Sequence, residues 1–235
     1  MNCRSFILVV KYIVYYRDIP EHLATAFWEK TVQDHYHTYE PKNGHGLRHD
    51  PISSIVGPRV IGWIGTQDTA GQPNLAPYSF CNIFNYKPAL IAFSSVGYKD
   101  SVRNAIETGV FTWNLATRPL AEAVNQSSLE QPVNEFELTQ LTPLAGQLVA
   151  APRVAQSPVS IECKVTQHFQ MTDQHQDALN TWMVIGEVVA VHIDPALIKD
   201  GIYHCAAAQP ILRGGGPADY YEISDQTLFH MYRPK

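Results

Sequence analysis

The stretch FSSVGYKDSVRNAIETG, from Phe93 to Gly109, contains the transition from an apolar run to a short polar segment. The apolar run that ends at Ser94 and Ser95 is short and continuous, which is typical of a buried strand. A helix is expected to begin near Asp100, to extend to about 107 and to stop at Gly109, since glycine commonly follows the last turn. The stretch therefore predicts a strand, a loop and a helix in immediate succession.

The start of this predicted helix has the chemistry of an anion site. A helix start leaves backbone N–H groups unpaired and carries a partial positive charge, which suits a phosphate. Further donors are three hydroxyls and an ammonium, those of Ser94, Ser95, Ser101 and Lys99. The alternative is that Asp100 or Ser101 simply caps the helix, and on this stretch alone that interpretation is favoured.

Apolar segments of strand type occur on both sides of the stretch. They are rich in β-branched and aromatic residues and are separated by turn residues. No regular alternation of strands with long helices is present, so parallel βαβ units are not indicated. The pattern predicts a mostly β protein, a barrel with helical additions, with strands at 59–66, 74–84, 88–95, 110–116, 158–169 and 182–193 and a last short strand at 228–234.

Several of these segments predict more than their own conformation. Pro77 cannot donate a ladder hydrogen bond, so its strand should have a bulge or an exposed edge there. Segment 158–169 alternates apolar and polar residues, which predicts a half-buried antiparallel strand with Glu162 on the polar face. Segment 182–193 is apolar on both faces, which predicts a central strand. Short helical pieces are expected at 118–128 and 134–141.

Composition limits the classes of function. The 235 residues are 45% apolar and 17% charged, which fits one large domain with a buried core. The net charge of -5 and the scattered Lys and Arg residues argue against nucleic-acid binding. The four cysteines are far apart, and Cys81 and Cys163 lie in strand segments. We therefore expect buried free thiols and a cytoplasmic location.

The first 37 residues are predicted to be an extension outside the main domain. Their apolar start is about eleven residues long, shorter than the about 20 that span a bilayer, so no membrane-spanning segment is expected. Arg17, Asp18 and Glu21 follow it, which fits a signal peptide poorly. Residues 21–36 have the apolar spacing of an amphipathic helix of about 14 residues.

The segment NLAPYSFCN, residues 74–82, favours a ligand site beside the predicted helix start. A kinked strand with exposed backbone suits a flat heterocycle, because its N–H and C=O groups can bind the ring edge while an aromatic side chain covers a face. The residues able to do so are Pro77, Tyr78, Ser79, Phe80 and Asn82. An ordinary bulged edge strand is the alternative.

Six motifs in a fixed order give the chain a family resemblance. The chain resembles the flavin reductase-like, FMN-binding split-barrel family in YEPKNGHGLRHDP, PRVIGWIGT, NLAPYSFCNIF, FSSVGYKDSVRNAIETGVFTWNLAT, PRVAQSPVSIEC and MVIGEVVAVHID. The similarity covers roughly residues 38 to 234, which places the predicted domain at 38–235. It implies a Greek-key split β-barrel with peripheral helices, and a homodimer that holds FMN near the subunit interface.

The resemblance also implies roles for individual residues. The strand from 74 to 82 would line the isoalloxazine ring of FMN, with Ser79 and Asn82 as polar contacts. Arg59 would be a second phosphate cation. The segment around the ribityl chain and the phosphate would be Ser94, Ser95, Lys99, Asp100 and Ser101.

Two residues depart from the family pattern. Cys81 stands where an aromatic residue is usual, and Trp113 stands where an aliphatic residue is usual. Either change could alter packing against the ring without removing the site.

Four histidines form the main rival to the flavin interpretation. Close histidines can bind zinc or copper, and the sequence places His35, His37, His45 and His49 near one another. No cysteine or carboxylate pattern completes a known metal site, so no metal is expected. The sequence also lacks a GxSxG motif, and no catalytic residue is assigned.

The resemblance predicts an FMN-dependent oxidoreductase with NAD(P)H as co-substrate, either a flavin reductase or an oxygenase-type flavoprotein. Its electrons would pass to a small-molecule or protein acceptor. The alternative is a non-enzymatic FMN-binding electron carrier or flavin store, which would use the same pocket.

Overall fold

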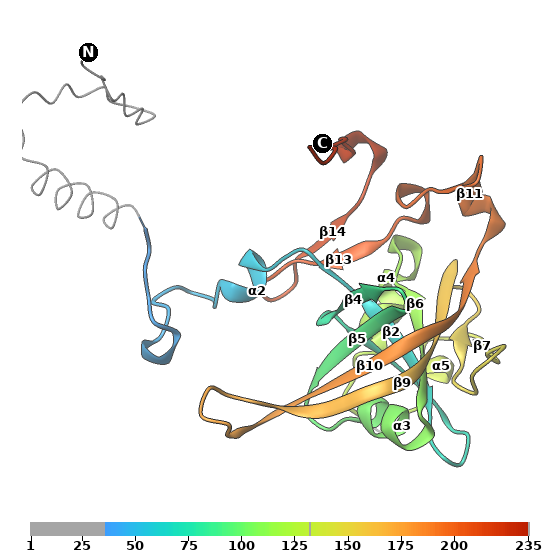
Figure 1. Ribbon diagram of the computed structural model, residues 1–235, viewed down its shortest axis with the longest axis horizontal. Coiled ribbons are helices and arrows are strands. Elements are labelled where there is room, and N and C mark those ends of the chain that lie inside the picture. The colour runs from blue at the N-terminus through green and yellow to red at the C-terminus, as the bar shows by residue number, and fades with distance from the viewer. Residues whose placement is uncertain (1–35, 132, 235) are drawn as a thin grey trace, which may run out of the picture. The chain divides into compact units, whose positions relative to one another are not determined.

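The computed structural model describes residues 36–131 and 133–234 (Figure 1). The chain divides into two compact units, Met1–Arg48 and His49–Lys235. The helix predicted at 21–36 lies outside the described residues except for its last position. The described part of the first unit is a loop with one 3-10 turn, η1 (Pro41–Asn43), as the glycines and prolines of that segment predict.

The second unit contains a seven-stranded antiparallel sheet in the order β3-β2-β6-β9-β10-β5-β4. Figure 1 shows the sheet curled on itself, with the β9–β10 hairpin extending past the barrel. This confirms the mostly β architecture. The strands are β2 (Gly62–Gln67), β3 (Pro73–Tyr78), β4 (Cys81–Tyr86), β5 (Ala89–Val96), β6 (Val110–Leu115), β9 (Val159–Thr172) and β10 (Ala178–Ile193).

One predicted strand, 74–84, is wrong as a single element. It divides at Ser79 and Phe80 into β3 and β4, which are consecutive in sequence but occupy opposite edges of the sheet. The chain therefore crosses from one edge to the other at this break, and the backbone N–H of Ser94 donates to the carbonyl of Phe80 at 2.8 Å. Pro77 lies in β3, an edge strand, which confirms the exposed-edge prediction.

Short strands complete the unit. They form a three-stranded sheet, β1 (Arg59–Val60), β13 (Ile211–Arg213) and β14 (Tyr220–Glu222), and two pairs, β7 (Pro143–Leu144) with β8 (Arg153–Val154) and β11 (Ile198–Lys199) with β12 (Ile202–Tyr203). The strand predicted at 228–234 is wrong, because that segment has no regular structure. The last strand is β14, which pairs with β13 instead.

The longest described helix is α3 (Asp100–Thr108), and it ends at Gly109 with a left-handed φ of 71°, as predicted. Val102 and Ala105 of α3 are buried against the barrel strands. The remaining helices are short and peripheral: α2 (Ile52–Ile55), α4 (Ala121–Gln126), α5 (Glu135–Leu138), and the 3-10 turns η2 (Arg118–Leu120), η3 (Pro195–Leu197), η4 (Ala206–Ala208) and η5 (Asp225–Thr227). The pieces predicted at 118–128 and 134–141 are thereby confirmed.

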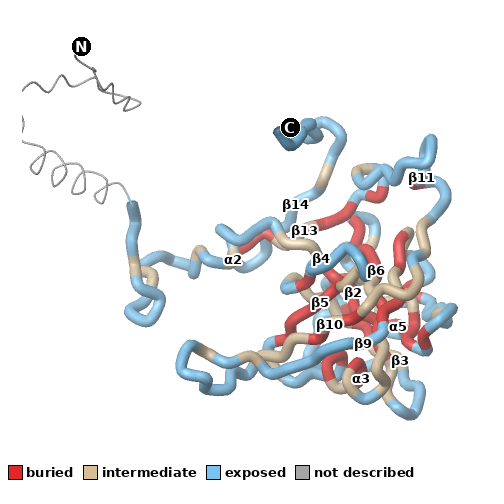
Figure 2. Tube along the Cα trace, in the orientation of Figure 1, coloured by how far each residue is buried: buried red, intermediate tan, exposed pale blue. Residues whose placement is uncertain are grey.

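The barrel interior is filled by aromatic and branched side chains. Figure 2 shows the buried segments of the backbone in red. The ring of Phe93 meets that of Phe111 edge-on at 5.3 Å between centroids. Gly186 faces this contact, because a Cβ there would lie 2.5 Å from Phe111 Cε1. The buried free thiols of Cys81 and Cys163 belong to the same core, which confirms that prediction. The strand predicted to be central, β10, lies between β9 and β5.

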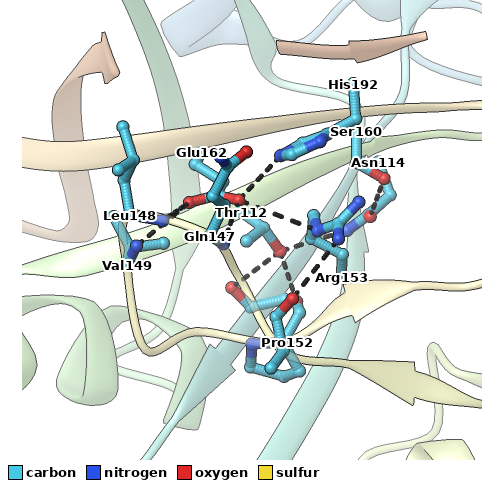
Figure 3. A network of polar contacts seen from close by, with 12 residues as sticks. Thr112, Asn114, Gln147, Leu148, Val149, Pro152, Arg153, Ser160, Glu162 and His192 are labelled. Carbon is cyan, nitrogen blue, oxygen red and sulfur yellow. Dashed lines mark hydrogen bonds and ion pairs between the residues drawn. The ribbon is translucent and has the colours of Figure 1, made fainter. Parts of the chain in front are cut away.

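The prediction for Glu162 is wrong. Its side chain lies on the same face of β9 as that of Lys164, but it is completely buried instead of facing solvent. Figure 3 shows the reason: the segment 147–149 runs over that face of the strand, and its backbone N–H groups point at the carboxylate. A carboxylate in this position is satisfied by hydrogen bonds instead of by water.

Candidate functional site

A cavity of about 720 Å³ lies where the chain crosses between the two sheet edges. Its wall includes the break itself and five of the eleven residues predicted for the site: Arg59, Ser79, Phe80, Asn82 and Ser94. The volume lies within the range of about 300–1,000 Å³ that is usual for small-molecule sites. The geometry thus gathers residues from β1, from the β3–β4 break and from β5 around one space.

Most of the remaining wall is apolar. It comes from α2, from the edge strands and from the β9–β10 hairpin, and includes Val56, Phe84, Val96, Met171 and Met183. The methionine side chains are flexible and polarizable, so they adapt to the face of a flat ring. A large apolar space with a few polar groups at one edge is the arrangement that suits a heterocycle.

Arg59 is held in the cavity wall by its neighbours. Its Nη1 donates to the carbonyl oxygens of Ser53 and Val56, and its guanidinium carbon lies 5.5 Å from the centroid of the Phe80 ring. Burial lowers the pKa of Arg59, and the nearby charge of Arg213 lowers it further. Within the described chain, the buried Nε of Arg59 has no hydrogen-bond partner.

A second group of predicted residues gathers beside the cavity without lining it. The ring of Tyr78 packs on Phe93 at 5.0 Å between centroids. Burial raises the pKa of the Tyr78 hydroxyl, while hydrogen bonds with Ser101 and Ser95 lower it. Asn74 Nδ2 donates to Ser101 Oγ at 2.9 Å. The structure therefore brings these hydroxyls together at the start of α3.

Lys99 and Asp100 complete this helix-start group. Lys99 is the N-cap residue in an extended conformation and makes no capping bond through its side chain. The cap interpretation for Asp100 or Ser101 is therefore wrong, because both lie inside the first turn. Asp100 is instead paired with Arg103 at 2.8 Å, and Lys99 Nζ lies 2.5 Å from Glu130 Oε1.

Strand β5 separates the two groups. Successive side chains of a strand point to opposite faces, and Ser94 lines the cavity while Ser95 meets Tyr78 on the other side. Pro77 of β3 pairs with Trp63 of β2 and does not line the cavity. Arg59 belongs to the cavity group rather than to the helix-start group.

Sequence reasoning missed several neighbours of the site. Met171 and Met183 reach the cavity from the β9–β10 hairpin, and Glu130 reaches Lys99 from the segment after α4. Asn74 lay in the predicted strand, but its contact with Ser101 was not foreseen. Periodicity identifies the elements that carry such residues, yet it does not say which elements meet.

The two departures from the family pattern are in contact. A Cβ added to Gly62 would lie 2.6 Å from Cys81 Sγ and 2.8 Å from Trp113 Cδ1, so both side chains converge on this glycine. Burial raises the pKa of Cys81 to about 12, although a hydrogen bond with Trp113 acts in the opposite direction. The small residue at 81 thus accompanies the large residue at 113, and the thiol stays protonated at neutral pH.

The histidine segment shows internal contacts of another kind. His37 Nε2 lies 2.7 Å from the carbonyl oxygen of His45, and the backbone N–H of Leu47 donates to His45 Nδ1 at 3.0 Å. In the part of the chain that the structure describes, no group of three His, Cys, Asp or Glu side chains is placed to hold a metal ion. Likewise, none of the described helices is long and apolar enough to cross a membrane.

The fold and the position of the cavity are now described, and comparisons with known proteins identify the family of this chain. Residues 57–210 match the flavin reductase like domain family. An uncharacterized protein of Aquifex aeolicus is 31% identical over 173 residues, which are 70% of this chain and 85% of that protein. The chain therefore belongs to the flavin reductase-like family, an FMN-binding family, and its fold is the split barrel.

Two solved structures show the same architecture. The nitrilotriacetate monooxygenase component B from Bacillus cereus superposes with a TM-score of 0.71 at 27% identity, over 82% of this chain and 95% of that chain. The 2-nitrobenzoate 2-nitroreductase from Pseudomonas fluorescens superposes with a TM-score of 0.69 at 27% identity, over 77% and 88% of the two chains. The described barrel is thus shared along nearly the whole length of both.

Proposed function

We propose that this protein is an FMN-dependent oxidoreductase that holds the flavin ring in the 720 Å³ cavity and uses NAD(P)H as co-substrate. The observation that carries the proposal is the break between β3 and β4, which places polar groups at one edge of an apolar space. Bound FMN supplies the hydride chemistry, and the protein supplies binding, orientation and electrostatics. Two structural neighbours are named for a monooxygenase component and a nitroreductase, which supports redox chemistry as the class.

The cavity residues fit the ring in distinct ways. Ser79 and Asn82 offer side-chain hydrogen bonds at the break, and β4 is an edge strand whose backbone groups face outward. Phe80 offers an aromatic face and Ser94 a hydroxyl from β5. These are the contacts that an isoalloxazine ring needs: polar partners at its edge and apolar cover on its faces.

We assign the ribityl chain and the phosphate to Lys99 and the start of α3, which follow the end of β5 at Val96, itself a residue that lines the cavity. The helix dipole favours an anion at the N-terminus of α3, and the Tyr78 hydroxyl beside it hydrogen-bonds with the buried hydroxyls of Ser95 and Ser101. Lys99 adds a charge at the same place. Its present partner is the exposed carboxylate of Glu130, which a phosphate would replace or share.

The homodimer and its cytoplasmic location belong to the same proposal. Edge strand β4 exposes large apolar side chains beside the cavity, with Phe84 63% and Tyr86 83% exposed. Such side chains are typical of a surface covered by a partner. Cys81, Cys163 and Cys205 are free thiols, which supports a reducing compartment. We also propose 38–235 as the FMN-binding unit and 1–37 as an extension.

A flavin carrier or store is the second candidate, because the same cavity would serve it. Among the described residues that line the cavity, none is an Asp, Glu, His or Lys that could act as a general acid or base. This composition favours a protein that holds the flavin without adding proton chemistry. The two candidates differ in whether bound flavin accepts hydride from a nicotinamide.

An absorption spectrum of the purified protein, before and after anaerobic addition of NADH and NADPH, distinguishes these functions. We expect flavin bands that bleach with one of the two nucleotides. A yellow protein that bleaches with dithionite but with neither nucleotide would favour the carrier. A colourless protein that also fails to bind added FMN would contradict both.

Replacing Lys99 with alanine should weaken FMN binding by about 1.5–3 kcal/mol, since a charge-assisted contact to the phosphate is lost. The lower end is expected because the ammonium is only about half-buried. Quenching of FMN fluorescence during titration measures the affinity. Glu130→Gln is the matched control: it removes the competing carboxylate and should leave FMN binding equal or tighter. Equal weakening in both variants would assign the effect to the Lys99–Glu130 ion pair itself.

A further inference from the structure

One continuous segment forms a side of the cavity, since every residue from 55 to 60 lines it. The segment includes the end of α2 and the whole of β1. Its side chains at Ile55 and Val56 are apolar, yet they are 72% and 66% exposed. Apolar side chains left exposed at the wall of a cavity are available to cover a ligand. We refer to residues 52–60 as the α2 wall.

The helix α2 is too short to hold this wall in place by itself. None of its four described residues is buried, and no side chain of the described chain caps it. Its hydrogen bonds are local, because the backbone N–H groups of Ser54 and Ile55 both donate to the carbonyl of Pro51. Helices shorter than about 12 residues are marginal in water without tertiary contacts. The position of α2 therefore depends on the segments packed against it.

Arg59 supplies the first attachment of α2. Its Nη1 donates to the carbonyl oxygens of Ser53 and Val56, at the C-terminal end of the helix. Carbonyl groups at this end have no partner within the helix and interact favourably with a cation. The guanidinium of Arg59 thus ties α2 to the start of β1.

The turn that follows β13 is fixed to the neighbouring strand in a similar way. Arg213 stands directly opposite Arg59 in the pairing of β1 with β13. Its guanidinium donates to the carbonyl oxygens of Gly215 and Asp219 at 2.8 Å and of Gly216 at 2.9 Å. The backbone N–H of Gly214 also donates to the carbonyl of Asp219 at 2.8 Å. These bonds give the turn 213–219 a defined position beside α2.

Gly215 is the residue at which this turn meets α2. A Cβ added to Gly215 would lie 1.7 Å from Ser54 Oγ and 2.6 Å from Ser54 Cα. The Cα belongs to the backbone, so rotation of the Ser54 side chain alone would not make room for a methyl group. Only glycine allows the two backbones to approach this closely.

We propose that Gly215 is a positioning residue for the flavin: it sets the distance between the turn and α2, and so places Ile55 and Val56 against a face of the FMN ring. This proposal rests on the proposed function, because the ring occupies the cavity that the α2 wall lines. Gly215 itself acts only through α2. The apolar side chains at 55 and 56 supply the contact with the ring.

Gly215→Ala is the test of this role. The added methyl group should displace α2 and weaken FMN binding about tenfold, which corresponds to the loss of one apolar side-chain contact. Quenching of FMN fluorescence during titration measures the affinity, under conditions in which circular dichroism shows each variant to be folded. Gly146→Ala is the matched control, since its Cβ would lie 2.2 Å from the carbonyl oxygen of Val149, outside the described lining of the cavity. It should lower stability through overpacking but leave FMN binding unchanged.

A second set of variants tests whether Gly215 acts through the α2 wall. The double variant Ile55→Ala, Val56→Ala removes the apolar contacts, and the exposure of both side chains makes a folding defect unlikely to accompany it. It should weaken FMN binding about tenfold or more. Adding Gly215→Ala to this variant should weaken binding by less than about twofold further, because residues that act through one another are not additive.

Several results would overturn the proposal. They are unchanged FMN affinity in Gly215→Ala, equal weakening in Gly146→Ala, and a full further loss when Gly215→Ala is added to the truncated wall. A protein that binds no FMN at all would refute the proposed function separately. The attachment of α2 would then be tested by hydrogen exchange of the flavin-free protein. Gly215→Ala should speed exchange of the backbone N–H groups of Ile55 and Val56 relative to Gly146→Ala, and equal exchange in both variants would overturn the positioning role.

Discussion

Replacing Glu162 with alanine is expected to lower the free energy of unfolding by about 3–5 kcal/mol, the cost of removing one partner from a buried charged network. The carboxylate is completely buried and accepts hydrogen bonds from the backbone N–H groups of Gln147, Leu148 and Val149 at 2.6, 2.6 and 3.0 Å. His192 Nε2 lies 2.7 Å from the same group. Alanine would leave all of these donors without their acceptor.

The cost is large because the network fastens a whole segment to the barrel. Arg153 lies 3.7 Å from Glu162, and the carbonyl of the neighbouring Pro152 accepts from Thr112 at 2.5 Å (Figure 3). Asn114 Oδ1 accepts from the backbone of Val154 at 2.9 Å, just beyond this loop. Loss of the carboxylate therefore weakens the attachment of 147–154 to β6 and β9 together.

Urea unfolding at neutral pH, followed by circular dichroism, measures this effect. Glu162→Gln keeps an acceptor of similar size and should lose less than alanine does. Lys164→Ala, an exposed position two residues along the same strand, is the control and should change stability by less than about 0.5 kcal/mol. A loss below about 1 kcal/mol in Glu162→Ala would show that water replaces the carboxylate.

The same carboxylate should make the free energy of unfolding decrease as the pH is lowered. Burial by itself raises the pKa of Glu162, but hydrogen bonds from Gln147, Leu148, His192 and Val149 bring it below the ordinary value of 4.5. The ionised group thus stabilises the folded state above pH 4.5, and this contribution is lost as pH falls from there through the lowered pKa. Glu162→Gln should flatten that decline. If the loss of stability below pH 4.5 is unchanged in Glu162→Gln, that loss belongs to other carboxylates.

Local chemistry explains which parts of the fold could be predicted from the sequence. The helix from Asp100 and its end at Gly109 depend on a few neighbouring residues, so both are predictable. Pro77 excludes a ladder donor wherever it stands, which is why its edge position was also predictable. The burial of Cys163 follows from the apolar alternation of its own strand.

Long-range contacts explain what could not be predicted. No glycine or proline lies at Ser79 and Phe80, so no local signal marks the point where the chain passes from β3 to β4 at the other edge of the sheet. Glu162 is buried because a segment about fifteen residues earlier covers it. For the same reason, sequence periodicity could not predict that Met171 lines the cavity.

Exchanging the two residues that depart from the family pattern is expected to show strong energetic coupling. Cys81 and Trp113 both meet Gly62, where an added Cβ would lie within 2.6–2.9 Å of their atoms. Cys81→Phe alone should lose about 1–3 kcal/mol of stability through overpacking against Trp113. Trp113→Val alone should lose about 3 kcal/mol, because the space beside the thiol is left unfilled.

The double variant Cys81→Phe, Trp113→Val has an aromatic residue at 81 and an aliphatic one at 113, which is the arrangement that the family resemblance implies. It should lose less stability than the sum of the single variants, with a coupling energy of about 0.5–3 kcal/mol. The double-mutant cycle is measured by urea unfolding of the unchanged protein, the two single variants and the double variant, followed by circular dichroism. Cys81→Ser with Trp113→Val is the control, since it fills no space and should show little coupling. Additive losses in the exchange itself would mean that the two side chains adapt independently around Gly62, and that the small residue at 81 does not depend on the tryptophan.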